Sequence, residues 1–264
     1  MSIHTSYLNV RPVRAFSDNY IWLIDSPRAR GQVVVVDPGD AVPVIAELHR
    51  SGASLAAILL THHHPDHIGG VSDLLHHREV PVAGPDDSRI AQRTRTVHDG
   101  ERCELPDLGL TFETLQVPGH TLSHIAFWGH GALFCGDTLF SAGCGRMFEG
   151  TPSQMNASLN KLRNLPPKTR VFCGHEYTAA NLRFALTVDP SNSAALEYRD
   201  RVAKVRASGD PTLPSTMELE NQVNPFLRCD DPVIAAAAAA HAGKSLEDAA
   251  EVFGVLRAWK DQFR

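Results

Sequence analysis

Short apolar runs alternate with helical patterns over the first two thirds of the chain. The β-branched run at residues 32–37 predicts a strand, and Pro38-Gly39 after it predicts a turn. Residues 42–50 carry apolar positions at helical spacing, and the apolar run 55–60 returns to a strand. The same reasoning predicts helices over 70–77 and 153–165, the latter capped by Ser153, and strands at 110–117, 124–128, 132–135 and 170–173. We therefore predict an α/β fold for this part of the chain.

The pattern changes after about Glu176. Apolar positions at helical spacing replace the strand-like runs, over residues 181–187, 193–207, 232–241 and 245–260. Asp231-Pro232 is a favourable helix start, and the alanine run 235–240 has high helix propensity. A low-complexity segment is the alternative for that run, but Val233 and Ile234 before it favour an ordered helix. We predict two domains, residues 1–175 and a helical domain at residues 176–264.

Composition and charge exclude several classes of protein. Hydrophobic residues make up 43% of the chain and charged residues 21%, which is ordinary for a soluble globular protein. The net charge of -5 argues against a general binder of nucleic acid or membranes, and no apolar run approaches the length of a membrane span. Residues 1–7 lack the pattern of a secretory signal, and the five cysteines form no Cys-x-x-Cys pair. We expect a cytoplasmic monomer.

The run from Thr61 to His67 concentrates side chains that bind metals. His62, His64, Asp66 and His67 lie together directly after the predicted strand 55–60. Several imidazoles and a carboxylate at a strand end are costly to bury without a partner. A divalent metal removes that cost, because neutral imidazole and carboxylate are its usual nitrogen and oxygen ligands. The alternating spacing lets His62 and His64 point one way while Asp66 and His67 turn to a neighbouring point, which suits two adjacent metals.

This His-x-His-x-Asp-His pattern after an apolar strand resembles the signature of the metallo-β-lactamase superfamily. Three later motifs, each after a short apolar stretch, match the remaining ligands of that superfamily: His120 in 117–124, Asp137 in 135–139 and His175 in 173–177. The resemblance implies an αββα sandwich that holds two divalent ions. By resemblance, the first ion is bound by His62, His64 and His120, the second by Asp66, His67 and His175, and Asp137 bridges them. It implies zinc, with iron or manganese as alternatives that the same ligands suit.

The helical tail narrows the resemblance to glyoxalase II, the hydroxyacylglutathione hydrolase family. Several segments resemble that family, from Asn19-Tyr20 to the last turn: the loop 143–150, the segments 174–178 and 224–228, and the basic segment 257–263. By resemblance, Arg146, Phe148, Tyr177, Arg257 and Lys260 contact the glutathione part of the substrate. Arg146 stands where some members have lysine, and Phe148 where some have tyrosine, so a hydroxyl contact is lost there while a backbone contact would survive.

The resemblance implies hydrolysis of S-D-lactoylglutathione and related S-2-hydroxyacylglutathiones to D-lactate and glutathione, the second step of methylglyoxal detoxification. The nucleophile would be a hydroxide that bridges the two metals, which can exist at neutral pH. Asp66 and Asp137 are the catalytic carboxylates in this scheme. The thiolate leaves without a strong general acid, because a thiol has a pKa of about 8.5.

Two other classes of function remain open from the sequence. One is a persulfide dioxygenase-like enzyme with a single iron, which would need neither the full second set of ligands nor the basic tail. The other is a non-catalytic metal-binding scaffold, which would be expected to have lost a ligand. Single residues also have alternatives: Asp37 closes a turn or orients a metal-binding histidine, and Arg257 and Lys260 contact substrate or form a solvated helix face. We expect His63 and His124 to be structural.

Overall fold

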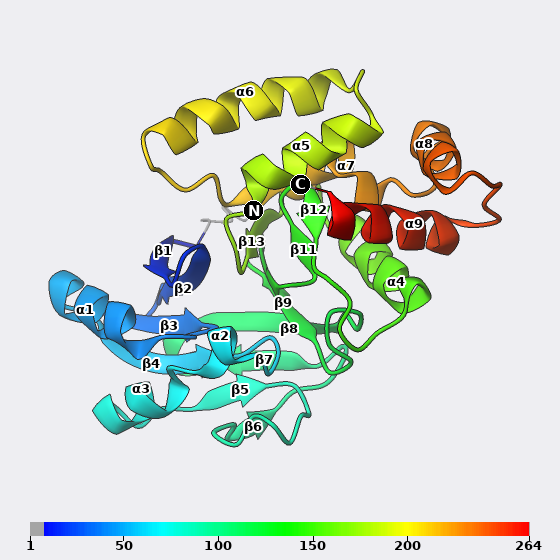
Figure 1. The fold of residues 1–264 in the computed structure, drawn as a ribbon. Coiled ribbons are helices and arrows are strands. Elements are labelled where there is room, and N and C mark those ends of the chain that lie inside the picture. The colour runs from blue at the N-terminus through cyan, green and yellow to red at the C-terminus, as the bar shows by residue number, and fades with distance from the viewer. Residues whose placement is uncertain (1–7, 264) are drawn as a thin grey trace, which may run out of the picture. The chain divides into compact units, whose positions relative to one another are not determined.

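The computed structural model describes residues 8–263, which divide into two compact units (Figure 1). The first unit comprises the described residues up to Gln116 together with Ser123–Gly136. The second comprises Val117–Leu122 and the described residues from Asp137 onward. The predicted domain boundary after His175 therefore falls inside the second unit, and it stays a prediction. The expectation about a signal at residues 1–7 concerns residues outside the described part of the chain.

The first unit contains strands of two sheets. The first sheet is mixed, with antiparallel pairing among its first three strands and parallel pairing from there on. Its strands, in spatial order, are β1 (Val10–Ala15), β2 (Asn19–Asp25), β3 (Gln32–Val36), β4 (Ser54–Leu59), β5 (Val82–Gly84) and β6 (Arg95–Thr96). The other strands pair antiparallel in chain order: β7 (Arg102–Leu105), β8 (Leu110–Gln116), β9 (Ile125–Gly129) and β10 (Ala132–Gly136).

Helices cover one face of the first sheet. The short elements of this unit are α1 (Ala41–Ser51), α2 (Pro65–Ile68), α3 (Val71–His77) and the 3-10 helix η1 (Pro106–Leu108). Val44 of α1 and Leu74 of α3 share a buried cluster with Val33 and Val35 of β3 (Figure 1). Val34 points to the opposite face and is also buried. A strand buried on both faces reads as a continuous apolar run, which is why residues 32–37 predicted β3.

The second unit is mainly helical. It contains the hairpin of β11 (Leu139–Phe140) and β12 (Gly143–Cys144), and β13 (Arg170–Cys173) paired antiparallel with β14 (Ser215–Thr216). Its helices are α4 (Pro152–Arg163), α5 (Thr178–Val188), α6 (Ser193–Ala207), α7 (Met217–Val223), the 3-10 helix η2 (Pro225–Leu227), α8 (Pro232–Ala242) and α9 (Ala249–Gln262). Phe226 stacks on Phe184 at 5.8 Å and meets Phe253 edge-on at 5.7 Å, so aromatic contacts join η2 to α5 and α9.

Most of the predicted elements are confirmed, including the alanine-rich helix α8. The predicted cap of α4 is wrong: Thr151 caps the helix and accepts a hydrogen bond from the Gln154 amide, while Ser153 lies inside it. α9 begins at Ala249, because the Asp248 carboxylate accepts from Glu251 N and so starts the helix there. The tail also contains β14, a strand of two residues that follows no periodic pattern.

Candidate metal centre

The histidine run joins strand β4 to the short helix α2. Pro65 occupies the first helical position, with His64 just before it, and its fixed φ angle favours a helix start there. His62 and His64 therefore lie on the extended connection, while Asp66 and His67 lie in the first turn. The change from strand to helix within the run brings the four predicted ligands of the first unit to one place.

Asp37 is the hydrogen-bonding centre of this part of the first unit. Its carboxylate accepts from the Thr61 backbone amide at 2.8 Å, the Thr61 hydroxyl at 2.7 Å and Nδ1 of His67 at 3.1 Å. Its backbone has a φ of 52°, in the left-handed region that few residues other than glycine adopt. Of the two roles open from the sequence, the structure supports the second: Asp37 orients a candidate metal-binding histidine.

These bonds decide which nitrogen of each imidazole carries the lone pair. Because Nδ1 of His67 donates to Asp37, its Nε2 is the acceptor atom. The Thr61 hydroxyl gives its proton to Asp37, so its oxygen accepts from Nδ1 of His62, 3.1 Å away. Nε2 of His62 is then also the acceptor atom. In the neutral form of each ring, these bonds select the tautomer that binds a metal through Nε2.

The imidazole rings of the first unit are crowded together. The centroid of the His62 ring lies 4.1 Å from that of His67 and 4.7 Å from that of His64. His124 stacks on His62 at 4.5 Å and is fully buried. Donor atoms of Asp37, His62 and His67 lie within 4.8 Å of one another. Protonation of such a group would place like charges in contact, so the cluster suits neutral rings around a cation.

A side chain of β2, a strand more than 40 residues earlier in the sequence, holds the Asp66 carboxylate in place. Nδ2 of Asn19, at the start of β2, donates to Oδ2 of Asp66 at 3.0 Å. The same Asp66 oxygen lies 3.6 Å from Nε2 of His67. Asn19 thus holds the Asp66 carboxylate next to Nε2 of His67, the nitrogen that carries the lone pair.

The second unit brings its own three predicted ligands together. Oδ2 of Asp137 lies 3.5 Å from Nε2 of His120 and 3.2 Å from Nε2 of His175. All three side chains are buried. Nδ1 of His120 lies 2.8 Å from the Arg146 carbonyl oxygen and donates to it, so its Nε2 carries the lone pair toward Asp137.

The donor set of the second unit fits divalent ions. Two ligands bound at about 2.1 Å in tetrahedral geometry lie about 3.4 Å apart. The separations of 3.2 and 3.5 Å between Asp137 and the two histidines match that value. Gly145 leaves the room that this packing needs: a Cβ there would stand 1.9 Å from the Asp137 carbonyl oxygen and 3.1 Å from Nδ1 of His120. Nitrogen and oxygen donors of this kind suit zinc, iron and manganese alike.

Three predicted substrate contacts surround these ligands. The Tyr177 ring stacks on His175 with centroids 4.8 Å apart. Phe148 is 64% exposed, and its ring meets His120 edge-on at 5.2 Å. The Phe148 amide donates to the His120 carbonyl oxygen at 3.2 Å, so this backbone donor is already used within the protein. The Arg146 side chain is largely exposed, with its Nε 3.5 Å from Asp261.

The two basic residues of α9 differ in environment. Arg257 is 5% exposed and donates to the Cys144 carbonyl oxygen at 2.9 Å and to Asp261 at 3.1 Å. Lys260 is half-buried, and its Nζ lies 5.4 Å from the centroid of the Phe184 ring. Burial, followed by repulsion from Arg257, lowers the pKa of the Lys260 ammonium to about 8. Neither residue lies on a solvated helix face, which removes that alternative.

Several supporting residues were missed from the sequence. Asn19 and Thr61 fall in segments that the motifs mark, but nothing in their spacing points to the bonds they make. Asp87 lies 3.3 Å from Nδ1 of His63 and accepts hydrogen bonds from Arg89 and Ser123. His63 therefore has a carboxylate partner outside the set of predicted ligands. The bond from Arg89, more than any other contact, holds the pKa of Asp87 well below its ordinary value.

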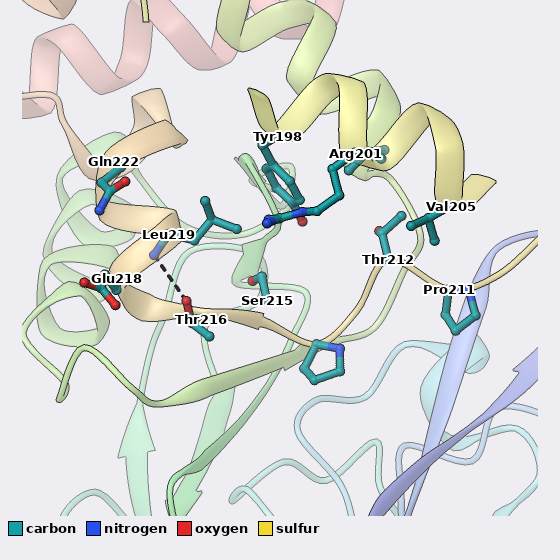
Figure 2. A pocket seen from close by; sticks show the side chains of 12 residues that line it. Tyr198, Arg201, Val205, Pro211, Thr212, Ser215, Thr216, Glu218, Leu219 and Gln222 are labelled. Atoms are coloured by element: carbon teal, nitrogen blue, oxygen red, sulfur yellow. Dashed lines mark hydrogen bonds between the residues drawn. The ribbon is translucent and has the colours of Figure 1, made fainter. Parts of the chain in front are cut away.

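A hollow of about 480 Å³ in the second unit lies beside α6 and α7 (Figure 2). Figure 2 shows Tyr198 and Arg201 on one side of it and Thr216 and Leu219 on the other. Within the described part of the chain, none of the predicted ligands or substrate contacts lines this hollow. The donor atoms that face one another, and not this hollow, therefore mark the candidate metal centre.

Comparison with known proteins identifies the family. The metallo-beta-lactamase superfamily model matches residues 15–175, and the model of the hydroxyacylglutathione hydrolase C-terminus matches residues 176–263. The hydroxyacylglutathione hydrolase of Cupriavidus taiwanensis is 51% identical over 97% of this chain and all of its own length. That of Photobacterium profundum is 50% identical, with the same coverage. The chain belongs to the hydroxyacylglutathione hydrolase family.

Solved structures agree on the fold of this family member. The crystal structure of ETHE1 from Myxococcus xanthus matches with a TM-score of 0.65 and 23% identity, over 96% of this chain and 90% of that one. The BLEG-1 B3 metallo-beta-lactamase matches with a TM-score of 0.62 and 23% identity, over 83% of this chain and 99% of that one. These identities show a shared fold and nothing about substrate. The predicted fold class and family are confirmed, with histidine and aspartate clusters typical of the binuclear site of the superfamily.

Between residues 8 and 263, no helix is long and apolar enough to cross a bilayer.

Proposed function

We propose that this chain hydrolyses S-D-lactoylglutathione and related S-2-hydroxyacylglutathiones to the 2-hydroxy acid and glutathione. The observation that carries the proposal is the match to named hydroxyacylglutathione hydrolases, at about half of all positions and over 97% of the chain. The predicted ligand residues are all present, with the donor atoms in each unit facing one another. A chain that had lost this activity would not be expected to keep the complete set.

We further propose that the two sets of ligands together hold two divalent ions. His62, His64 and His120 would bind the first, Asp66, His67 and His175 the second, and Asp137 both. The support is chemical: His62, His67 and His120 each have Nδ1 committed to a protein oxygen, which leaves Nε2 for the ion. When bound, two such ions supply a nucleophilic water at neutral pH and polarise the thioester carbonyl. Zinc is the ion we expect.

The protein's own groups orient the reaction. Asp66, fixed by Asn19, accepts a hydrogen bond from the attacking water and aims its oxygen at the carbonyl carbon. As the new C–O bond forms, the water passes one proton to this carboxylate, the C–S bond breaks, and the sulfur leaves as a thiolate, which is stable enough to need no strong acid. Burial raises the pKa of Cys144 to about 11, so the cysteine beside this site stays a thiol and does not compete as a nucleophile.

The glutathione part would be held by residues of the second unit. Its carboxylates need cations, which Arg146 would supply from an exposed position and Lys260 from a half-buried one. Tyr177 would add a hydroxyl contact while its ring supports His175. Arg257 is predicted to contact the substrate as well, from a buried position where it already holds two protein oxygens. Phe148 would offer its exposed ring as an apolar contact.

Turnover of S-D-lactoylglutathione by purified protein of measured metal content tests the proposal. We expect release of glutathione and D-lactate in equal amounts, and loss of turnover after metal removal. A D-lactoyl thioester that lacks the tripeptide is the control substrate, and it should react with a lower kcat/KM. Consumption of a glutathione persulfide with uptake of O₂, and no thioester cleavage, would contradict the proposal and favour the dioxygenase alternative.

A further inference from the structure

The hairpin of β11 and β12, together with the residues directly before and after it, includes or contacts the predicted ligands of the second unit. Asp137 lies just before it in the sequence. After the hairpin, the Arg146 carbonyl oxygen accepts from Nδ1 of His120 at 2.8 Å. Within it, the Phe140 ring meets His175 edge-on with centroids 5.7 Å apart. The positions of Asp137, His120 and His175 therefore depend on where this hairpin lies.

The tip of the hairpin has a strained backbone. Ala142 has a φ of 55°, which costs energy for a residue with a Cβ atom, so the surrounding structure must hold it there. Glu220 does so from α7: its carboxylate accepts from the Ala142 amide at 2.8 Å and from the Ser141 hydroxyl at 2.8 Å. The Tyr198 hydroxyl, from α6, lies 2.8 Å from the same Ser141 oxygen.

Asn224 holds both strands of the hairpin at once. Its Nδ2 donates to the Phe140 carbonyl oxygen at 3.1 Å and to the Gly143 carbonyl oxygen at 2.9 Å, one on each strand. Two further side chains donate hydrogen bonds to neighbouring backbone carbonyls. Asn181 donates to the Ser141 carbonyl oxygen, and Arg257 donates to the Cys144 carbonyl oxygen. We call Asn181, Glu220, Asn224 and Arg257 the hairpin clamp. Its members come from α5, α7, the end of α7 and α9, and all are buried.

The local sequence explains why Glu220 and Asn224 point inward. Thr216 caps the start of α7, and its hydroxyl accepts from the Leu219 amide at 3.3 Å (Figure 2). Glu220 and Asn224 are four residues apart and so share one face of this short helix. Asn224 ends α7 and starts η2, because its Oδ1 accepts from the Phe226 amide at 3.1 Å. The segment 224–228, which the sequence marked without assigning it a task, thus has a place in the clamp.

We propose that Glu220 and Asn224 are positioning residues for the metal ligands His120 and Asp137, acting through the hairpin. The inference rests on the proposed function. Without the clamp, the strained tip relaxes, and the Arg146 carbonyl and Asp137 lose their fixed places. Metal affinity and kcat then fall together. A residue that merely stabilised the helical region would lower the melting temperature and leave both unchanged.

Asn224→Ser separates the two tasks of this residue. Serine can still start η2 by accepting from the Phe226 amide, but it is too short to reach both hairpin carbonyls. In metal-loaded protein we expect a loss of metal affinity of about 10-fold to 100-fold, measured by competition with a chelator. At saturating metal, kcat should fall at least about 10-fold, with less than a twofold change in KM, since partners of metal ligands affect activity on the same scale as affinity.

The matched control is Asn192→Ala in the same helical region. Asn192 caps α6 and donates to the Gln222 carbonyl oxygen, and within the described part of the chain it makes no hydrogen bond to the hairpin. It should lower the melting temperature and leave metal affinity at the wild-type value. Glu220→Gln, which keeps the volume and one good acceptor, gives a second variant if Asn224→Ser fails to fold, and it should shift affinity in the same direction.

Metal affinity within twofold of wild type in both clamp variants, with only the melting temperature lowered, would overturn the inference. Measurements on the wild-type protein distinguish a failure of the clamp proposal from a failure of the proposed function. Wild-type protein that binds two metals and cleaves the thioester, beside unaffected clamp variants, refutes the clamp alone. Wild-type protein that does neither refutes the proposed function.

Discussion

Asp37 illustrates how one buried side chain can set the chemistry of its neighbours. It accepts three hydrogen bonds, and two of them fix the lone pairs of His62 and His67. Asp37→Asn keeps the shape but turns one acceptor oxygen into a donor, which then faces either the Thr61 amide or both the Thr61 hydroxyl and Nδ1 of His67. We expect metal affinity to fall about 10-fold to 100-fold.

Chelator competition measures that change, and Asp40→Ala is its control. Asp40 caps α1 by accepting from the Val42 amide, so its loss should destabilise the fold without altering metal affinity. Equal affinities in Asp37→Asn and wild type would show that Asp37 only closes the turn before Pro38.

Lys260 gives a second prediction at the residue scale, in the dependence of KM on pH. Its pKa of about 8 means that the ammonium is charged below that pH and loses its charge as the pH rises through it. Binding of a glutathione carboxylate should therefore weaken between pH 7 and pH 9, and KM should rise. The rise in KM should approach 10-fold, which corresponds to the loss of one charge-assisted hydrogen bond of about 1.5 kcal/mol.

Two controls isolate the role of Lys260. Lys260→Arg, which stays charged throughout, should remove the rise in KM over this range. A lactoyl thioester without the tripeptide should show no Lys260-dependent change. A rise that persists unchanged in Lys260→Arg would assign the effect to another group.

At the scale of elements, helix starts show where local sequence decides the structure. Thr151 and Gln154 form a reciprocal capping box, with Pro152 at the first helical position of α4. Thr151→Ala should lower the free energy of unfolding by about 1 kcal/mol in urea denaturation, and Ser153→Ala by less than about 0.5 kcal/mol. A larger loss for Ser153→Ala would restore the assignment made from the sequence alone.

Elements with a strong period could be predicted, and those that depend on distant partners could not. The apolar run of β3 and the spacing in α6 carry their structure in their own residues. β14 has two residues and exists because it pairs with β13, more than 40 positions earlier. The bonds from Asn19 to Asp66 and from Asn224 to the hairpin join segments 47 or more positions apart, and no local pattern marks them. The ligands themselves could be predicted because their motif is local.

At the scale of the whole molecule, the seven predicted ligands are divided between the two compact units. His62, His64, Asp66 and His67 belong to the first, and His120, Asp137 and His175 to the second. The helical region does more than supply the predicted substrate contacts, because its side chains bond to the hairpin that follows Asp137. Its family model begins at residue 176, although its side chains support ligands that precede it in the sequence.

Asp137 is the residue on which the account of the centre depends most, since it is assigned to both ions. The most direct measurement compares the metal content and the S-D-lactoylglutathione turnover of wild type and Asp137→Ala, each purified and dialysed in the same way. We predict two metals per chain and rapid hydrolysis in wild type, and fewer than two metals with at least a 1,000-fold lower kcat in the variant, about 4 kcal/mol of lost transition-state stabilisation. An Asp137→Ala protein that retains two metals and turns over at a near-normal rate would contradict the account.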